Sequence, residues 1–342
     1  MPKILEKKKV YPISPALHHY LQEYERLTTI PITYQDLLRY DNKIPLYDQL
    51  GRDTLWVTVF YPQHDMDRIY YALKMIYSIL KADGDVSVME HLYIDRVDLC
   101  IYGNTRPFRV RIVNRINDNF DYFYLKNADA SRIYGLELEH ILSPNRISYL
   151  VAEQTLIEEH IAGIPGDRFF QDQLHNGMQN LTRLAKEFVK FNERCFVRLL
   201  GDMHSTNFVV DVTPDFDELH YRIRAIDFDQ QSYEGRKTIY MPQYFKQNNA
   251  IIQVGLQLMT PESVRQYQTE EHALIATRMR TSRHQMQDLT EAMTKDTLAP
   301  KNHVTRLRDD LSQHYQTSMF EKCGSMGDLV KTSLQAALHT SI

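Results

Sequence analysis

The chain has 342 residues, of which 43% are hydrophobic, and a formal net charge of −4 at pH 7. That length and composition fit one large domain or two lobes around a substantial core, and the small negative charge argues against a nucleic-acid partner. No apolar run approaches the length of a transmembrane helix, no signal-peptide apolar segment follows Met1, and the three cysteines form no C-x-x-C pair. We therefore expect a cytoplasmic protein without disulfide bonds.

Residues 1–92 have the pattern of an N-terminal extension made of helices and one strand. The stretch L-W-V-T-V-F-Y at 55–61 is rich in β-forming residues, and Pro62 directly after it ends a strand. The stretch 65–80 repeats apolar residues at helical spacing. Two further helices are predicted at 16–27 and 34–40. The sequence indicates no function for this extension.

Residues 93–162 have the pattern of a small, β-rich lobe. Short polar turns separate the apolar runs, which predicts strands joined by hairpins. A helix is predicted over 128–142, because Asp129 suits its N-cap and Pro144 lies just beyond its end. The predicted strands lie at residues 97–102, 108–113, 122–126, 146–153 and 155–161.

Residues 163–342 are mostly helical by the same criteria. Thr260 and Pro261 make a good helix start, with an N-cap followed by proline at the first helical position, and this helix is expected to continue past Met286. The other helices of this region are predicted at residues 178–193, 303–319 and 326–338.

A run of polar residues with a β-like run after it lies between the helix predicted at 178–193 and the helix that starts at Pro261. It begins R-L-L-G-D-M-H-S-T-N-F-V-V-D at Arg198, and a second run, Y-R-I-R-A-I-D-F-D, ends at Asp229. Asp202, Asn207 and Asp227 thereby stand at the ends of neighbouring strands. Carboxylate and amide oxygens of this kind are the ligands that Mg²⁺ prefers. The spacing Asp-x-x-x-x-Asn also matches the catalytic loop of kinases.

This stretch resembles the catalytic and metal-binding loops of the kinase-like fold, in the form used by aminoglycoside and choline phosphotransferases, whose loop reads H-G-D-x-H-x-x-N. The phosphatidylinositol-kinase loop, G-D-R-H-x-x-N, is also similar. Leu200 stands where the first family usually has His, and Met203 where the second has Arg. The resemblance covers residues 97–235. It implies an α+β, bilobal protein-kinase-like fold with a β-rich N-lobe over 93–162 and a mostly helical C-lobe over 163–342.

The resemblance also implies ATP and Mg²⁺ as cofactors and assigns roles within the loop. Asp202 would accept or orient the hydroxyl of the acceptor. Asn207 and Asp227 would ligate Mg²⁺ on the nucleotide phosphates. Asp229 is either a second metal ligand or a cap of the following turn with Ser232. His204 is expected to stabilise the loop by hydrogen bonding.

In the small lobe, Lys126 stands where a kinase-like fold carries its phosphate-binding lysine. Glu137 falls near the apolar side of the helix predicted over 128–142. An unpaired buried carboxylate is costly, so Lys126 is the natural partner, as in the kinase Lys–Glu pair. The alternative is that Glu137 lies at the margin of the apolar side and Lys126 is a solvated strand-end charge.

Two further segments are candidates for nucleotide contacts on the same resemblance. The turn at 103–107 holds one glycine, and Asn104 and Thr105 are small enough to leave its backbone open to phosphate. The strand over 155–161 resembles the hinge between kinase lobes, where the backbone around Glu159 and Ile161 would pair with adenine. An ordinary buried strand followed by a Gly/Pro loop fits the same residues.

The sequence therefore favours an ATP- and Mg²⁺-dependent phosphotransferase that acts on a hydroxyl of an acceptor, preferably a small molecule. A protein or a lipid headgroup is an alternative acceptor, although an A-P-E motif of ordinary protein kinases is absent. A nucleotide-binding pseudokinase scaffold is the second hypothesis, motivated by the turn with one glycine and by Leu200. A P-loop NTPase is excluded because no G-x-x-x-x-G-K-[ST] occurs.

Overall fold

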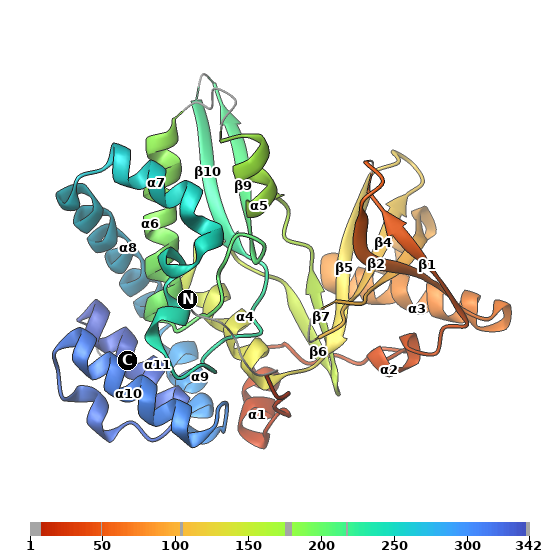
Figure 1. Ribbon diagram of the computed structural model, residues 1–342. Helices are drawn as coiled ribbons and strands as arrows, with labels where there is room; N and C mark the ends of the chain where they lie inside the picture. Colours follow the sequence, from red (N-terminus) through yellow and green to blue (C-terminus); the bar gives the residue numbers. More distant parts are fainter. Residues whose placement is uncertain (1–7, 49, 103–104, 175–179, 217, 340–342) are drawn as a thin grey trace. The chain divides into compact units, whose positions relative to one another are not determined.

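The computed structural model describes residues 8–48, 50–102, 105–174, 180–216 and 218–339. The chain forms two compact units. The sheet unit contains Leu21–Asp129 and Ile147–His160. The helical unit contains Met1–Tyr20, Ala130–Arg146 and Ile161–Ile342. One unit is rich in β-sheet and the other is mostly helical (Figure 1), so the predicted α+β class is confirmed.

The described part of the sheet unit is built on one seven-stranded antiparallel sheet, with the strand order β1-β2-β3-β4-β5-β7-β6. Neighbours in the chain mostly pair as hairpins. The strands are β1 (Asn42–Tyr47), β2 (Asp53–Phe60), β3 (Leu92–Cys100), β4 (Phe108–Asn114), β5 (Phe120–Asn127), β6 (Tyr149–Ala152) and β7 (Thr155–Glu159).

The long helix α3 (Gln63–Lys81) covers one face of this sheet (Figure 1). Its apolar residues recur every three or four positions, which places them on one side of the helix, and Ile69, Leu73 and Ile76 are almost completely buried. Strand residues alternate between the two faces of a sheet, so Phe123 and Leu125 of β5 join the same core. The short helix α2 (Tyr34–Leu37) is fixed by a capping box at its start.

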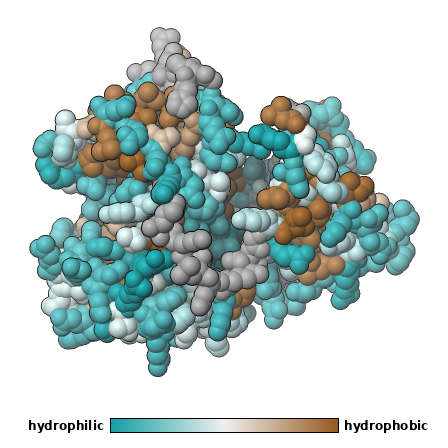
Figure 2. All heavy atoms as spheres, in the orientation of Figure 1, coloured by the Kyte–Doolittle hydropathy of each residue, from teal (hydrophilic) through white to brown (hydrophobic). Residues whose placement is uncertain are grey.

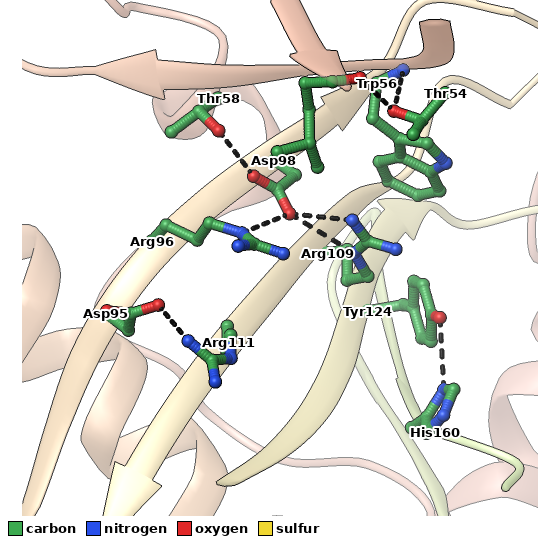
Figure 3. A network of polar contacts seen from close by, with 11 residues as sticks. Thr54, Trp56, Thr58, Asp95, Arg96, Asp98, Arg109, Arg111, Tyr124 and His160 are labelled. Atoms are coloured by element: carbon green, nitrogen blue, oxygen red, sulfur yellow. Dashed lines mark hydrogen bonds and ion pairs between the residues drawn. The ribbon is translucent and has the colours of Figure 1, made fainter. Parts of the chain in front are cut away.

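The opposite face of the sheet carries a network of charges and rings (Figure 3). Asp98 is fully buried, although its sequence neighbours Val97 and Leu99 point to the apolar core on the other face. It accepts hydrogen bonds from Arg96 Nε (3.0 Å), Arg109 Nη2 (2.8 Å) and Thr58 Oγ1 (2.8 Å). The Arg109 guanidinium also lies 4.3 Å from the centre of the Trp56 ring. The buried carboxylate is therefore paired and hydrogen bonded, which offsets its loss of hydration.

The boundary expected near residue 92 does not separate two units. β2 pairs with β3 across that boundary, with Val57 opposite Leu99 and Val59 opposite Val97, and all four side chains are buried in one core. The expected extension thus contributes two strands and α3 to the sheet unit. β1 was not predicted, because its residues are mostly exposed and include Pro45, which is tolerated only at the edge of a sheet.

The other edge of the sheet, β6, is met by residues just after α1 (Pro15–Glu23). Leu27 forms a parallel bridge with Val151, the Thr28 N–H donates to Val151 O (2.9 Å), and the Val151 N–H donates to Arg26 O (2.8 Å). The Arg26 guanidinium lies 4.8 Å from the centre of the Tyr149 ring. The backbone groups on the outer side of Val151 are therefore satisfied by the chain itself.

The helical unit contains a hairpin of β9 (Phe208–Asp215) and β10 (Glu218–Ala225), with β8 (Ile164–Pro165) against β9. α6 packs along β10, and α7 and α8 pack on α6 (Figure 1). Its helices are α4 (Ala130–Leu142), α5 (Gly166–Asp172), α6 (Leu181–Val197), α7 (Asn249–Leu258), α8 (Pro261–Thr281), α9 (Arg283–Lys295), α10 (Lys301–Tyr315) and α11 (Met326–Leu338).

The predicted helix from Pro261 past Met286 is two helices in the structure. α8 starts as predicted, with Thr260 in a capping box with Ser263, but it ends at Thr281. Ser282 leaves the helical conformation and α9 begins at Arg283. The sequence signals no break here because it contains neither glycine nor proline between Pro261 and Met286 except at its start. After the break α9 lies against α11, a tertiary contact that the local sequence does not signal.

α7 is the least covered helix of this unit that the structure describes. It has no charged residue, only Ile251 is buried, and Leu256 is 71% exposed. Hydrophobic atoms gather at the surface in this region of Figure 2. A cavity of about 600 Å³ lies between α6, α7 and α8. Throughout the described ranges, no helix combines the length and the apolar composition that crossing a membrane requires.

Candidate active site

The loop between α6 and β9 is held by backbone hydrogen bonds from the segment that follows β10. The Gly201 N–H donates to Gln230 O (3.2 Å), and the Asp202 N–H donates to Ile239 O (3.0 Å). Asp202 adopts a left-handed conformation with φ of 62°. That conformation is uncommon for a residue with a side chain, and it persists only where the surroundings fix it. The loop therefore presents Asp202 in one defined orientation.

The same loop brings together the three residues that the sequence singled out. The Asn207 side chain donates from Nδ2 to Asp202 O (2.9 Å), so the two ends of the loop are tied to each other. The Ile226 N–H donates to Asn207 O (3.0 Å), which places Asp227 directly beside Asn207. The hairpin of β9 and β10 sets this register, because Phe208 pairs with Ala225.

The neighbouring carboxylates of this region affect the pKa of Asp202. Burial, together with the negative charges of Asp227, Glu234 and Asp229, raises the pKa of Asp202 to about 7. A general base works best when its pKa lies near the working pH, and Asp202 meets that condition. Glu234 was not recognised in the sequence, because nothing in its spacing connects it with Asp202.

His204 is integrated into the loop. Its Nδ1 lies 2.9 Å from Thr206 Oγ1 and its Nε2 lies 3.4 Å from Asn207 Nδ2, whereas its distance to Asp202 Oδ1 is 3.7 Å. Burial lowers the pKa of His204. A neutral histidine that bonds within its own loop has a structural role, as the sequence suggested.

Asp227 and Asp229 converge on a cation that the sequence did not reveal. Arg132, in the first turn of α4, is only 1% exposed. Its Nη1 lies 2.9 Å from Asp227 Oδ1 and also forms a short contact with Asp229 Oδ1. The Asp229 N–H donates to Asp227 Oδ1 (3.0 Å), which holds the turn between the two carboxylates. The side chain of Asp227 remains 36% exposed, and that of Asp229 15%.

The oxygen atoms of this loop offer a partial ligand set for Mg²⁺. Within the described ranges, no group of three or more His, Cys, Asp or Glu side chains is arranged to hold a metal ion. Two carboxylate oxygens nevertheless converge on one cationic nitrogen, and the Asn207 amide uses Nδ2 for its hydrogen bonds, which leaves Oδ1 as an oxygen ligand. Mg²⁺ commonly needs only one or two carboxylates because phosphates and water complete its shell. The residues fit an ion that arrives with a nucleotide.

Lys126 and Glu137 each have a partner within their own unit. Lys126 Nζ is buried on β5 and forms an ion pair with Glu158 Oε2 (2.9 Å) on β7. Glu137 is fully buried on α4, where Tyr20 Oη (2.6 Å) and Gln285 Nε2 (3.2 Å) donate to its Oε2. Glu137 thus lies on a buried side of α4, as expected, and the alternative of a marginal Glu137 with a solvated Lys126 is wrong, because both side chains are buried. The pairing of Lys126 with Glu137 stays a prediction.

The remaining predicted nucleotide contacts lie in different surroundings. The Glu159 N–H donates to Ser148 O (3.1 Å), and its side chain pairs with Lys81 Nζ (2.7 Å), so this backbone donor is already used within the sheet unit. Ile161 is buried in the helical unit. Thr105 follows β3, and its carbonyl is 3.5 Å from Tyr34 Oη. Asn104 lies outside the described residues.

Comparison with known proteins adds little at the level of sequence. No family model matches the chain, and no curated protein matches it. Among solved structures, it is similar to the Rio2 kinase of Chaetomium thermophilum in complex with ADP, Mg²⁺ and phosphoaspartate, with 9% identity, 87% of this chain and 80% of that chain covered, and a TM-score of 0.30.

A second similar structure is the autoinhibited serine kinase domain of the giant muscle protein titin. The identity is 12%, the match covers 71% of this chain and 92% of the titin chain, and the TM-score is 0.28. At this level of identity and superposition, neither likeness carries information about the chemistry of this chain. The site must be judged on its own residues.

Proposed function

We propose that this protein is an ATP- and Mg²⁺-dependent phosphotransferase that moves the γ-phosphoryl group of the nucleotide to a hydroxyl of an acceptor. One observation carries the proposal: a loop fixed in a left-handed conformation at Asp202 is hydrogen bonded to Asn207, and Asn207 O accepts from the N–H of Ile226, the residue before Asp227. Those are the residue types and the spacing that kinases use for the acceptor hydroxyl and for the metal.

Asp202 is the group that receives the acceptor in this proposal. Its carboxylate accepts a hydrogen bond from the attacking hydroxyl and takes the proton as the bond to phosphorus forms. The hydrogen bonds at Gly201 and Asn207 keep the loop in place, so little reorganisation is needed during the reaction.

Asn207 and Asp227 are the proposed ligands of Mg²⁺, which would neutralise charge on the transferred phosphoryl group. Asp227 contributes its partly exposed carboxylate, and Asn207 its Oδ1. Lys126 stays the predicted phosphate-binding lysine, and its ion pair with Glu158 orients the ammonium on β5. A small-molecule acceptor is proposed on the resemblance of the loop to aminoglycoside and choline phosphotransferases.

Phosphoryl transfer from labelled ATP to a panel of hydroxyl compounds, lipid headgroups and proteins tests this function. Asp202→Asn removes the base, and Asp227→Asn removes a metal ligand; each is expected to reduce turnover by about 100-fold or more. Asp211→Asn, on the same hairpin but away from the loop, is the matched control and should retain activity. Equal turnover by all four proteins would contradict the proposal.

A nucleotide-binding scaffold is the second candidate, and the position of Arg132 favours it. A guanidinium on Asp227 can satisfy the acidic turn without a metal. Thermal melting with ATP, in the presence and absence of Mg²⁺, distinguishes the two functions. A scaffold is expected to bind nucleotide equally well with Asp227→Asn and to transfer no phosphate, whereas the phosphotransferase loses both Mg²⁺-dependent stabilisation and turnover.

A further inference from the structure

Arg132 is fixed against the acidic turn by more than its charge. The neighbouring Ser131 Oγ donates to Gln231 O (2.5 Å), just beyond Asp229. Gly135, one turn further along α4, lies so close to that segment that a Cβ would be 3.1 Å from the Cβ atoms of both Phe228 and Gln231. α4 therefore packs directly on the segment that carries Asp227 and Asp229.

The surroundings of α4 hold it in this position. All of its residues except His140 are buried, and it lies against α8 and α9. The buried Tyr134 Oη donates to Asp296 Oδ2 (2.8 Å), and Glu139 forms a buried ion pair with Arg198, the residue directly after α6. Moving α4 away would break these buried contacts together, which is costly. These contacts hold the Arg132 guanidinium in the site.

The acidic turn consequently contains one built-in cation. Asp227 Oδ1 accepts from both Arg132 Nη1 and the Asp229 N–H, and Asp229 Oδ1 is engaged by the same guanidinium nitrogen. A metal ligand in this turn must therefore come from the exposed side of Asp227. In kinases that use two Mg²⁺ ions, the corresponding Asp and Asn hold the two ions between them. Here the position shared by Asp227 and Asp229 is already filled by a positive charge.

We propose that Arg132 replaces the second metal ion, so that this site binds one divalent cation per nucleotide, held by Asp227 and Asn207. Asp229 is then the ion-pair partner of Arg132 and orients it; Asp229 is not a metal ligand. This inference rests on the proposed function, because the ion arrives with a nucleotide. It extends that function, because the Arg132 guanidinium supplies the positive charge that a second Mg²⁺ ion would otherwise supply.

The number of bound ions is the direct test. Mn²⁺ is titrated into the full chain with a non-hydrolysable ATP analogue, the protein being in excess, and free Mn²⁺ is followed by its electron paramagnetic resonance signal. The wild-type protein should bind one ion per bound analogue even at millimolar Mn²⁺. Arg132→Met removes the charge at similar length and should bind a second ion, and Mn²⁺ should raise its melting temperature more than that of the wild type.

Two variants separate the charge of Arg132 from general damage. Arg132→Lys keeps the charge and is expected to stay at one ion. Arg194→Met removes another buried arginine of the same unit, one paired with Glu187 and Glu271, and should also stay at one ion. Two ions in the wild type, or one ion in Arg132→Met, overturns the inference while leaving the phosphotransferase function intact. If the analogue does not bind, the proposed function itself fails.

A folding defect in Arg132→Met would not leave the question open. Asp229→Asn removes the second carboxylate while retaining Arg132 and Asp227. Because Asp229 is assigned to Arg132 and not to the metal, this variant should still bind one Mn²⁺ with the analogue. Loss of that ion in a folded Asp229→Asn protein, as judged by circular dichroism, would show that Asp229 is a ligand and would overturn the assignment.

Discussion

Some residues of the site are marked by a motif in the neighbouring sequence, whereas others reach the site only through contacts between distant parts of the chain. Asp202 and Asn207 could be placed together because the loop motif fixes their spacing, and Asp227 could be placed beside them because it ends the next β-like run. Their roles stay predictions. Arg132 could not, because its contact with Asp227 spans 95 positions and nothing around it in the sequence marks a site. The pairing of a buried charge is a tertiary property, and only the folded chain shows it.

The partner of Lys126 could not be predicted from the sequence either. Lys126 was expected to pair with the buried carboxylate of Glu137, but the partner that the structure shows, Glu158, stands on a neighbouring strand whose register the sequence does not specify. Lys126 lies opposite Leu156, which puts Glu158 two residues further along on the same face. A shift of the register by one residue would have placed a different side chain there.

His160 offers a prediction about pH that is independent of catalysis. Its Nδ1 lies 3.2 Å from Tyr124 Oη, its ring packs against Tyr122, and burial lowers its pKa below the ordinary 6.5. The unfolded chain therefore takes up a proton first as the pH falls through 6.5, and the free energy of unfolding decreases until the folded protein is protonated too. Stability is fully retained above that range.

Urea unfolding between pH 8 and pH 5 measures this loss. His160→Gln keeps a hydrogen-bonding side chain without the titration, and its unfolding free energy should fall less over the same interval. His91→Gln removes an exposed histidine from the same unit and should follow the wild type. An unchanged pH dependence in His160→Gln would contradict the prediction.

At the scale of elements, the approach of α5 to the site loop is unusually close. Gly166 begins α5, and a Cβ on it would lie 2.5 Å from Phe208 Cε2 and 2.7 Å from Ser205 O. The backbone there is also joined by the Asp167 N–H, which donates to Ser205 O (3.0 Å). Gly166→Ala must push the loop between Asp202 and Asn207 out of place.

We expect Gly166→Ala to destabilise the protein by about 1–3 kcal/mol, the usual cost of overpacking, and to lower turnover as well. Gly324→Ala is the matched control, since its nearest neighbour would be 3.8 Å away, and its effect should stay within about 0.5 kcal/mol. Chemical unfolding and a turnover assay on both variants provide the comparison. Equal stability of the two variants would mean that the loop tolerates displacement.

The elements themselves were predictable to different degrees. The strands around residues 108–126 and the helix Met326–Leu338 were anticipated closely, because alternation and helical periodicity are strong there. β1 and the break at Ser282 were missed. Both depend on neighbours in space: an exposed edge strand has no apolar alternation, and a helix end without glycine, proline or a cap is set by what packs against it.

For the whole molecule, the assignment of segments to units was the least predictable property. The helical unit takes α4 from between two strands of the sheet unit, so each unit is discontinuous in the chain. Because each has a core of its own, we expect calorimetric unfolding to deviate from a single two-state transition. Leu73 lies in one core and Leu289 in the other, and both are fully buried.

Leu73→Ala and Leu289→Ala test the independence of the units. Each is expected to cost about 2–5 kcal/mol, the usual range for a buried leucine, but in a different unit. Scanning calorimetry should show that each variant lowers the melting temperature of a different transition. A single transition that both substitutions lower equally would mean that the chain unfolds as one cooperative body.

The two edge strands of the seven-stranded sheet, β1 and β6, affect whether this protein aggregates at high concentration. β1 carries Pro45, which has no N–H to offer an incoming strand, and Val151 of β6 already exchanges hydrogen bonds with residues 26–28. Neither margin is a good template on which a second molecule can add its own backbone. The edge strands therefore disfavour the addition of strands from other molecules, and we expect little fibril formation although the sheet unit is rich in β-forming residues.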